Sequence, residues 1–364
     1  MTVLTLTILE RGTLRVKDVA DCYDWEVKMD YINNDKSSFT ITGPIIAQKG
    51  DFVFAKLPNG KYSRPVANGK IRPFYFGIVD TNETEEDESK VEAVSIYNLV
   101  NFDFPATSKT GSSVQSHMMK LLMLWLFGDV SKKTDFISVR TEGPDLSFSY
   151  QPANPPTSTN MVEYFINIFE KYCVVWEVEW VGYDTSGQFM VSTVIRAKEG
   201  SFKIKNNVAD FTNWSVYVTK AHYATENMVY IIDKTTKNSE SPTILSTWYI
   251  NNSGEITQSL VDVDLPTRPK IYLYDATSSD KPSYKEVAQS ELSGSNYSHV
   301  ITVDVRDNSQ LVSFNDIDIG KQVSLTYDKT RYRSILTGYS LSSSSSYISL
   351  TFGHIRNTLK SLIK

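Results

Sequence analysis

Two pairs of carboxylates have the spacing in this chain that best suits chemistry. Asp262 and Asp264 are two residues apart, as are Asp316 and Asp318, and this spacing would place each pair on one side of a strand. Two carboxylates at a suitable separation can act as a general acid and a general base. Neither pair has an aromatic cleft beside it in the sequence that would indicate a sugar substrate. We therefore predict no catalytic residues and expect that the protein is not an enzyme.

The residue types that bind metals are scattered along the chain. The four histidines, His117, His222, His299 and His354, include no pair at the spacing of a helical metal site. We interpret each as a surface histidine or as a core histidine with satisfied hydrogen bonds. The acidic run at residues 83–88 would suit a hard cation, but it is more typical of a solvated hairpin that keeps a sheet edge from pairing. The sequence predicts no metal site and no cofactor.

Charge and motifs exclude several further classes of protein. The net charge of −5 provides no basic surface, so we expect no specific nucleic-acid binding. The chain has no Gly-rich phosphate loop and no nucleophile elbow. Cys22 and Cys173 are far apart and are expected to be free thiols. The longest apolar helix candidate, residues 118–127, is too short to span a bilayer, and the first residues do not resemble a signal peptide. We expect synthesis in the cytoplasm and no integral membrane segment.

The elements that must position these residues are mostly strands. Aromatic residues make up 12% of the chain, with 21 tyrosines, which favours sheets over helical bundles. We predict a mainly β fold with α+β insertions, built from two related antiparallel β-barrels and two inserted smaller domains. The predicted segments are an N-terminal β-barrel at 1–105, an inserted α+β domain at 106–205, the first part of a second barrel at 206–260, a small α+β insertion at 261–310, and the closing part of the second barrel at 311–364.

The two predicted barrels share a sequence pattern. The tetrapeptide GDFV that starts at Gly50 resembles GKQV at Gly320, and each precedes an alternating run, a turn and a strand with a glycine, Gly77 or Gly338. This pattern indicates a divergent duplication, although antiparallel meanders in general have similar patterns. We predict that the barrels superpose, with Gly50 matching Gly320 and Gly77 matching Gly338.

Three helices are expected in the inserted regions. The first covers residues 113–127 and carries apolar residues on one face. The second follows Asn160, which with Glu163 has the pattern of a capping box. The third has Pro282 in its first turn and ends at Gly294.

This order of barrels and insertions resembles that of the hub proteins that plug the distal end of phage tail tubes. The closing segment, from Gly320 through Tyr332 and Gly338 to residues 351–353, is similar to the end of siphophage members called tail-associated proteins. The likeness is greatest to the short form in lactococcal siphophages, which lacks a C-terminal lysin. In that family, two related barrels from each of three subunits form a ring with pseudo-sixfold symmetry.

The resemblance implies a structural virion protein at the tail tip or baseplate. It implies a homotrimer that docks on the distal tail protein ring, closes the tube and opens for DNA ejection. The tape measure protein and the receptor-binding proteins used in host attachment are further candidate partners. We expect the inserted regions, 106–205 and 261–310, to act as the moving plug, because polar linkers at 107–113, 151–159 and 277–283 connect them to the barrels.

A carbohydrate-binding adhesin module that takes part in host recognition is the alternative function. It would also be rich in tyrosine and tryptophan. Its aromatic side chains should gather in one exposed groove, whereas those of a hub should be distributed among the barrel cores and the subunit contacts.

Overall fold

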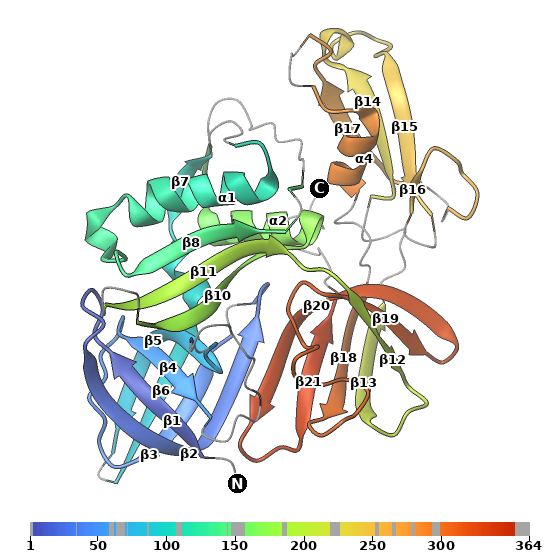
Figure 1. The fold of residues 1–364 in the computed structure, drawn as a ribbon. Helices are drawn as coiled ribbons and strands as arrows, with labels where there is room; N and C mark the ends of the chain where they lie inside the picture. The colour runs from blue at the N-terminus through green and yellow to red at the C-terminus, as the bar shows by residue number, and fades with distance from the viewer. Residues whose placement is uncertain are drawn as a thin grey trace.

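Figure 1 shows the fold in a computed structural model, which describes residues 3–33, 35–57, 62, 70, 72–85, 87–106, 111–143, 145–146, 157–183, 188–218, 226–251, 255–263, 267–277, 281–292 and 299–353. Strands make up 51% of the structure and helices 15%, which confirms the mainly β class. Several predicted features lie outside the described residues. These are His222, His354, Asp264 and Gly294, and parts of the three linkers.

The N-terminal region is a closed antiparallel barrel. Leu4, Leu6 and Ile8 are buried and alternate with half-buried threonines, so one side of the first strand fills the barrel interior. The strands are ordered β1-β4-β5-β6-β3-β2, and β2 pairs with β1 to close the barrel. Their bounds are β1 (Leu4–Leu9), β2 (Val16–Asp30), β3 (Ser37–Thr42), β4 (Phe52–Lys56), β5 (Tyr75–Thr84) and β6 (Glu88–Ser95). A 3-10 helix, Ile96–Val100, follows β6 directly.

A second set of six strands repeats this spatial order. The order is β12-β19-β20-β21-β18-β13, so in both sets the first strand lies beside the fourth, followed by the fifth, sixth, third and second. One strand differs in direction, because β12 runs parallel to β19 whereas β1 is antiparallel to β4. Among the described residues no pairing joins β12 to β13. The bounds are β12 (Ser201–Lys205), β13 (Phe211–Val218), β18 (His299–Arg306), β19 (Gln322–Tyr327), β20 (Thr330–Ser342) and β21 (Tyr347–Phe352).

The turn before the fourth strand is the same in both sets. Gly50 and Gly320 have φ of 94° and 90°, in the left-handed region that favours glycine. Each donates its N–H to a carbonyl on the fifth strand, that of Val79 or of Leu336, at 2.8 Å. In both sets the residue after that acceptor, Asp80 or Thr337, forms a β-bulge and has no partner on the sixth strand. The predicted equivalence of Gly50 and Gly320 is therefore confirmed.

The predicted match between Gly77 and Gly338 is wrong. In the shared register Gly338 takes the place of Thr81, and Gly77 takes the place of Ser334. Each glycine has its own reason to lack a side chain. A Cβ on Gly77 would collide with the Tyr75 ring inside the first barrel, and one on Gly338 would lie 2.8 Å from Asp30 of the other barrel. Close backbone approach explains both glycines, but the approach is to different neighbours.

Gly320→Ala is expected to destabilise the protein by about 1 kcal/mol more than Gly50→Ala. Both substitutions force alanine into a left-handed conformation, at about 1–2 kcal/mol. Only the Cβ at position 320 is crowded, lying 3.0 Å from Cγ of Lys198 and 3.1 Å from Val175, whereas at Gly50 the contacts are 3.8 Å or longer. Urea unfolding of both variants checks this difference. Gly43→Ala is the control for backbone strain alone, because its φ is 87° and nothing lies within 4 Å. Equal losses at the two positions would contradict the predicted crowding.

The two sets of strands are joined into one sheet and one core. Residues of β2 from Glu26 to Asp30 pair with β20 from Ser342 to Gly338. The largest buried cluster contains side chains of both sets, among them Trp25 and Leu341. In Figure 1 the first set, in blue, and the second, mainly in red, lie side by side.

The first inserted domain packs two helices on a three-stranded sheet of order β10-β11-β8. The sequence predicted both helices. Ser113 and Ser116 form a capping box at the first helix, and Asn160 accepts from Val162 and Glu163 at the second. The bounds are β7 (Asp103–Ala106), α1 (Val114–Leu122) with a π-helical turn at Met123–Phe127, a 3-10 turn at Val130–Lys132, β8 (Ile137–Glu142), β9 (Thr157–Asn160), α2 (Met161–Tyr172), β10 (Val174–Tyr183) and β11 (Phe189–Ala197).

Residues 226–292 form a second inserted unit, which we call the distal module. The sequence assigned residues 206–260 to the second barrel, but only β13 belongs there. The strands after it build a separate sheet of order β16-β15-β14-β17, with β14 parallel to β17. The alternating pattern of a strand does not specify its partner, so the boundary at 260 is wrong. The bounds are β14 (Met228–Asp233), a 3-10 turn at Lys234–Thr236, β15 (Ile244–Ile250), β16 (Ile256–Thr257), β17 (Pro269–Tyr274) and α4 (Tyr284–Leu292).

The two inserted units differ in how they are attached. The core of the first inserted domain continues into the outer side of the first barrel, where the rings of Phe52 and Phe136 are 5.2 Å apart. The core of the distal module, around Val229, Tyr272 and Val287, contains only its own residues. Its α4 contacts α2, as Figure 1 shows at upper right. Within the described residues, the molecule thus consists of one large body and one separately packed module.

Candidate functional site

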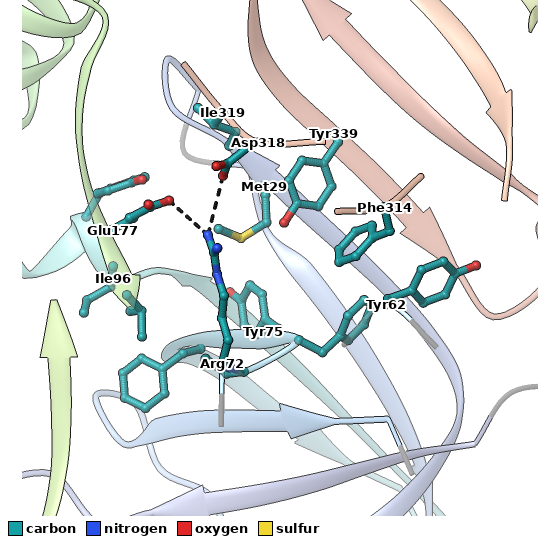
Figure 2. A pocket seen from close by; sticks show the side chains of 15 residues that line it. Met29, Tyr62, Arg72, Tyr75, Ile96, Glu177, Phe314, Asp318, Ile319 and Tyr339 are labelled. Atoms are coloured by element: carbon teal, nitrogen blue, oxygen red, sulfur yellow. Dashed lines mark hydrogen bonds and ion pairs between the residues drawn. The ribbon is translucent and has the colours of Figure 1, made fainter. Parts of the chain in front are cut away.

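A pocket lies where the first barrel, the second set of strands and the first inserted domain meet. Figure 2 shows Met29 and Tyr75 from the first barrel, Glu177 from β10, and Asp318 and Tyr339 from the second set of strands around it. The glycine turn at 320 brings the segment before β19 back toward β10, since Cys173 and Val175 lie next to that glycine.

Five charged side chains connect the three regions at this pocket. Arg72, just before β5, lies 3.3 Å from Glu177 and 3.5 Å from Asp318. Lys198, just after β11, forms an ion pair with Glu177 and lies 3.0 Å from Asp318. Arg196, which lies on β11, forms an ion pair of 2.6 Å with Glu177. Because Glu177 and Lys198 are only 13% and 4% exposed, these pairs are shielded from water and salt.

The network fixes Glu177 in its charged form. Burial raises the pKa of this carboxyl, but the positive charges of Lys198, Arg72 and Arg196 outweigh it and hold the pKa well below its usual range. An acid–base catalyst needs a pKa near the working pH, which this carboxylate lacks. The arrangement is suited to holding three regions of the chain together.

An aromatic wall completes the junction on the side of α2. Tyr31 packs against Tyr97 and Phe169, with ring centroids 4.6 and 4.4 Å apart, and its hydroxyl accepts a hydrogen bond from the backbone N–H of Trp176. Burial raises the pKa of Tyr31 far above its usual value. This tyrosine therefore stays neutral and serves as a packing residue.

Three of the four carboxylates considered in the sequence analysis, Asp262, Asp316 and Asp318, lie within the described residues. Asp316 and Asp318 lie in turns before β19 rather than on one side of a strand, with buried Ile317 between them. Asp318 faces the junction, whereas Asp316 accepts from the backbone and hydroxyl of Ser313 at 3.0 and 2.8 Å. Asp262 lies in an exposed turn.

The two described histidines are core residues. His117 shares a hydrogen bond of 2.8 Å with Tyr164, and His299 shares one of 2.8 Å with Ser334. Both are buried. Across the described ranges, no group of three or more His, Cys, Asp or Glu side chains is placed to hold a metal ion.

His299 should make the protein sensitive to mild acid. Burial lowers the pKa of His299 to about 4, whereas in the unfolded chain it is about 6.5. The unfolded chain therefore binds the proton first, and stability is lost as pH falls from about 6.5 to 4, by about 3 kcal/mol in total. Urea unfolding of wild type and His299→Gln at pH 7 and pH 4.5 measures this contribution. The wild type should lose more stability than the variant, and equal losses would contradict the assignment.

The acidic run and the cysteines have ordinary structural roles. The run closes the hairpin between β5 and β6, with a hydrogen bond from Glu85 N–H to the Glu88 carbonyl. Cys22 is buried, and burial raises the pKa of its thiol to about 12, so it is unreactive. Cys173 is half-buried, and both cysteines are free thiols.

Sequence reasoning missed the junction. The available signal was the alternation of Glu177 with Trp176 and Val178 in a strand whose neighbour carries Arg196. Charges at inward positions of neighbouring strands indicate a buried ion pair. The contributions of Arg72 and Asp318 depend on the tertiary fold, and no sequence pattern points to them.

Comparison with solved structures gives matches over nearly the whole chain. A tail protein from Neisseria meningitidis MC58 has a TM-score of 0.53 at 11% identity, covering 96% of both chains. The 43 kDa tail protein of prophage MuSo2 from Shewanella oneidensis has a TM-score of 0.53 at 10% identity, covering 97% of this chain and 98% of that one. A chain of the p2 virion baseplate in its activated conformation has a TM-score of 0.50 at 13% identity, covering 96% and 98%. This chain has the fold of phage tail and baseplate proteins.

The match extends beyond the barrels. Because each alignment covers at least 96% of both chains, the shared fold includes the inserted units. No protein-family profile matches the sequence, and no curated protein matches it. In the part of the chain that the structure describes, no helix is long and apolar enough to cross a bilayer.

Proposed function

We propose that this protein is a structural virion protein, the homotrimeric hub at the distal end of a siphophage tail. It closes the tail tube before infection and opens for DNA ejection. Its partners are the distal tail protein ring, the tape measure protein and receptor-binding proteins. The tail and baseplate proteins that share its fold support this assignment, as does the resemblance of its closing segment to short tail-associated proteins.

The repeated strand order is the observation that carries the proposal. Two sets of six strands with the same order and the same glycine turn give each chain two similar units. A sixfold ring is matched by three such chains, and rings closed by heterologous contacts are a common route to symmetric assembly. The mass of the purified protein in solution tests this number of copies.

The distribution of aromatic side chains weighs against a carbohydrate-binding adhesin. In the described residues, the exposed large aromatic side chains are Tyr23, Tyr183, Tyr217 and Tyr284, and they lie on four different elements. Trp25, Trp176 and Phe39 are buried in cores, and the other tryptophans are half-buried. A sugar groove would need several of them together on one exposed surface.

The distal module, rather than both inserted regions, is the plug. The first inserted domain shares its core with the first barrel, and the buried Glu177 network ties it to both barrels. Moving it would expose this core and separate buried charges. The distal module has a separate core, so it can move without losing any of its own packing. The expectation that residues 106–205 also move is therefore replaced by a fixed ring with one moving module per chain.

A further inference from the structure

Inside one chain, the two sets of strands are joined through an edge of each set. Residues 26–30 of β2, the second strand of the first set, pair antiparallel with residues 338–342 of β20, the fifth strand of the second set. Val27 and Leu341, which are partners in this pairing, are only 0% and 3% exposed. A second strand of one set and a fifth strand of the other therefore form a well-buried contact, which we call the inner contact.

The counterparts of these two strands have open edges. β13, the second strand of the second set, pairs with β18 on one side, and no described strand pairs with its other side. β5, the fifth strand of the first set, pairs with β4 over residues 75–78 and with β6 over residues 77–84. Along residues 81–84, no described strand occupies the side on which β2 pairs with β20. Each chain therefore has one open edge of each kind that the inner contact uses.

The open strand β13 has the sequence pattern of β2. The register shared by the two sets, followed through β3 and β6 and through β18 and β21, places residues 215–218, SVYV, at the position of residues 26–29, EVKM. A tryptophan precedes each of these segments, and valine is the second residue of both. Tyr217 and Val218 are 61% and 44% exposed, whereas Met29, the counterpart of Val218, packs against the buried cluster between the two sets. β13 thus retains the pattern of a strand that a partner covers.

We infer that β13 of one chain pairs antiparallel with residues 82–85, at the end of β5, in the next copy of this chain. This inference rests on the proposed trimer. Carried over from the inner contact, the register places Ser215 opposite Glu85 and Tyr217 opposite Glu83. The two surfaces are different, so each chain uses β13 toward one neighbour and β5 toward the other. Such heterologous contacts build a ring, and three chains close it with the inner contact repeated between copies.

The charges of the four edge strands favour this pairing over its alternatives. In the inner contact Glu26 is opposite Ser342, and in the contact between copies Ser215 is opposite Glu85, so neither pair contains two carboxylates. Pairing β2 of one copy with β5 of another would place Glu26 opposite Glu85, and like charges directly opposite each other destabilise a sheet. Pairing β13 with β13 of another copy would give a twofold contact, which cannot join three equivalent chains.

A disulfide across the pairing tests the inference in the full-length protein. Tyr217→Cys combined with Glu83→Cys places two thiols on directly opposed residues, within the Cα separation that a disulfide needs. Oxidation with copper phenanthroline should link the chains at these positions and give a covalent trimer on a non-reducing gel, at least tenfold above the product of either single variant. Lys28→Cys with Ser340→Cys, the corresponding pair of the inner contact, is the positive control and should form its disulfide within one chain. Tyr217→Cys with Lys285→Cys, which is exposed on α4, is the negative control.

A proline in β13 tests the backbone part of the contact. In β2 the N–H groups of Trp25 and Tyr31 donate to Ser343 Oγ and to the Thr337 carbonyl, at 3.2 and 3.0 Å, so alternate residues of this strand donate toward β20. By the shared register Val216 donates toward the open edge of β13, where a proline is tolerated in the single chain. Val216→Pro should weaken each contact between copies about tenfold, measured as the concentration dependence of the mass, with an unaltered circular dichroism spectrum. Unaltered association would contradict the inference.

The outcomes separate this inference from the proposed function. If the protein is trimeric by mass and the positive control forms its disulfide, the absence of a link between positions 217 and 83 overturns the inference while the proposed trimer stands. Covalent dimers from Tyr217→Cys alone would mean that β13 pairs with its own copy, and would also overturn it. A protein that remains monomeric contradicts both the inference and the proposed function.

Discussion

Glu177→Gln should lower the free energy of unfolding by about 3 kcal/mol, the usual loss when one partner of a buried charge cluster is removed. The substitution keeps the shape of the side chain but removes the negative charge that Arg72, Arg196 and Lys198 share. Among the described residues, Lys198, which is 4% exposed, would retain Asp318 as its ionic partner, and so would Arg72. Urea unfolding followed by tryptophan fluorescence measures the loss, since buried Trp176 is next to the substituted residue.

Glu142→Gln is the matched control for this prediction. Glu142 also pairs with Arg196, at 3.0 Å, but its side chain is 39% exposed. Solvent-exposed ion pairs contribute about 1 kcal/mol or less. The two variants remove the same charge from carboxylates that share a partner, so the difference between them isolates the effect of burial at the junction. A loss at Glu177 no larger than at Glu142 would contradict the view that this network holds the three regions together.

Locking the distal module to the body should abolish DNA ejection. A disulfide across the contact between α2 and α4 would leave the barrels unaltered, so tails should assemble normally. If the module is the part that moves, the oxidised particles should retain their DNA when triggered, and a reducing agent should restore ejection. Single-cysteine variants at the two positions are the controls and should eject DNA under both conditions. Normal ejection from fully cross-linked particles would show that opening does not need this movement.

Local features of the fold follow well from the sequence. Alternating runs predict most strands of both sets, and Asn160 caps α2 as expected. The likeness of the segments at Gly50 and Gly320 predicts a shared turn, because only glycine readily adopts the left-handed conformation that the turn needs. These features depend on a few neighbouring residues, which is why the sequence specifies them.

Features that depend on distant partners could not be predicted. Nothing in residues 228–257 distinguishes a strand of the barrel from a strand of a separate sheet, since both alternate in the same way. The parallel direction of β12 depends on the path of the chain through an entire domain. The junction requires Arg72, Glu177 and Asp318 to meet from three regions. Glu177 lies 105 residues after Arg72, and Asp318 lies 141 residues after Glu177.

The number of copies in solution tests the central claim most directly. Native mass spectrometry or light scattering of the full chain at micromolar concentration should give a mass three times that of the 41.2 kDa chain. Two barrels per chain and three chains account for a sixfold ring, and the two other cyclic assemblies of similar size, a dimer and a tetramer, do not. A trimer is the predicted result, and a stable dimer would contradict the account.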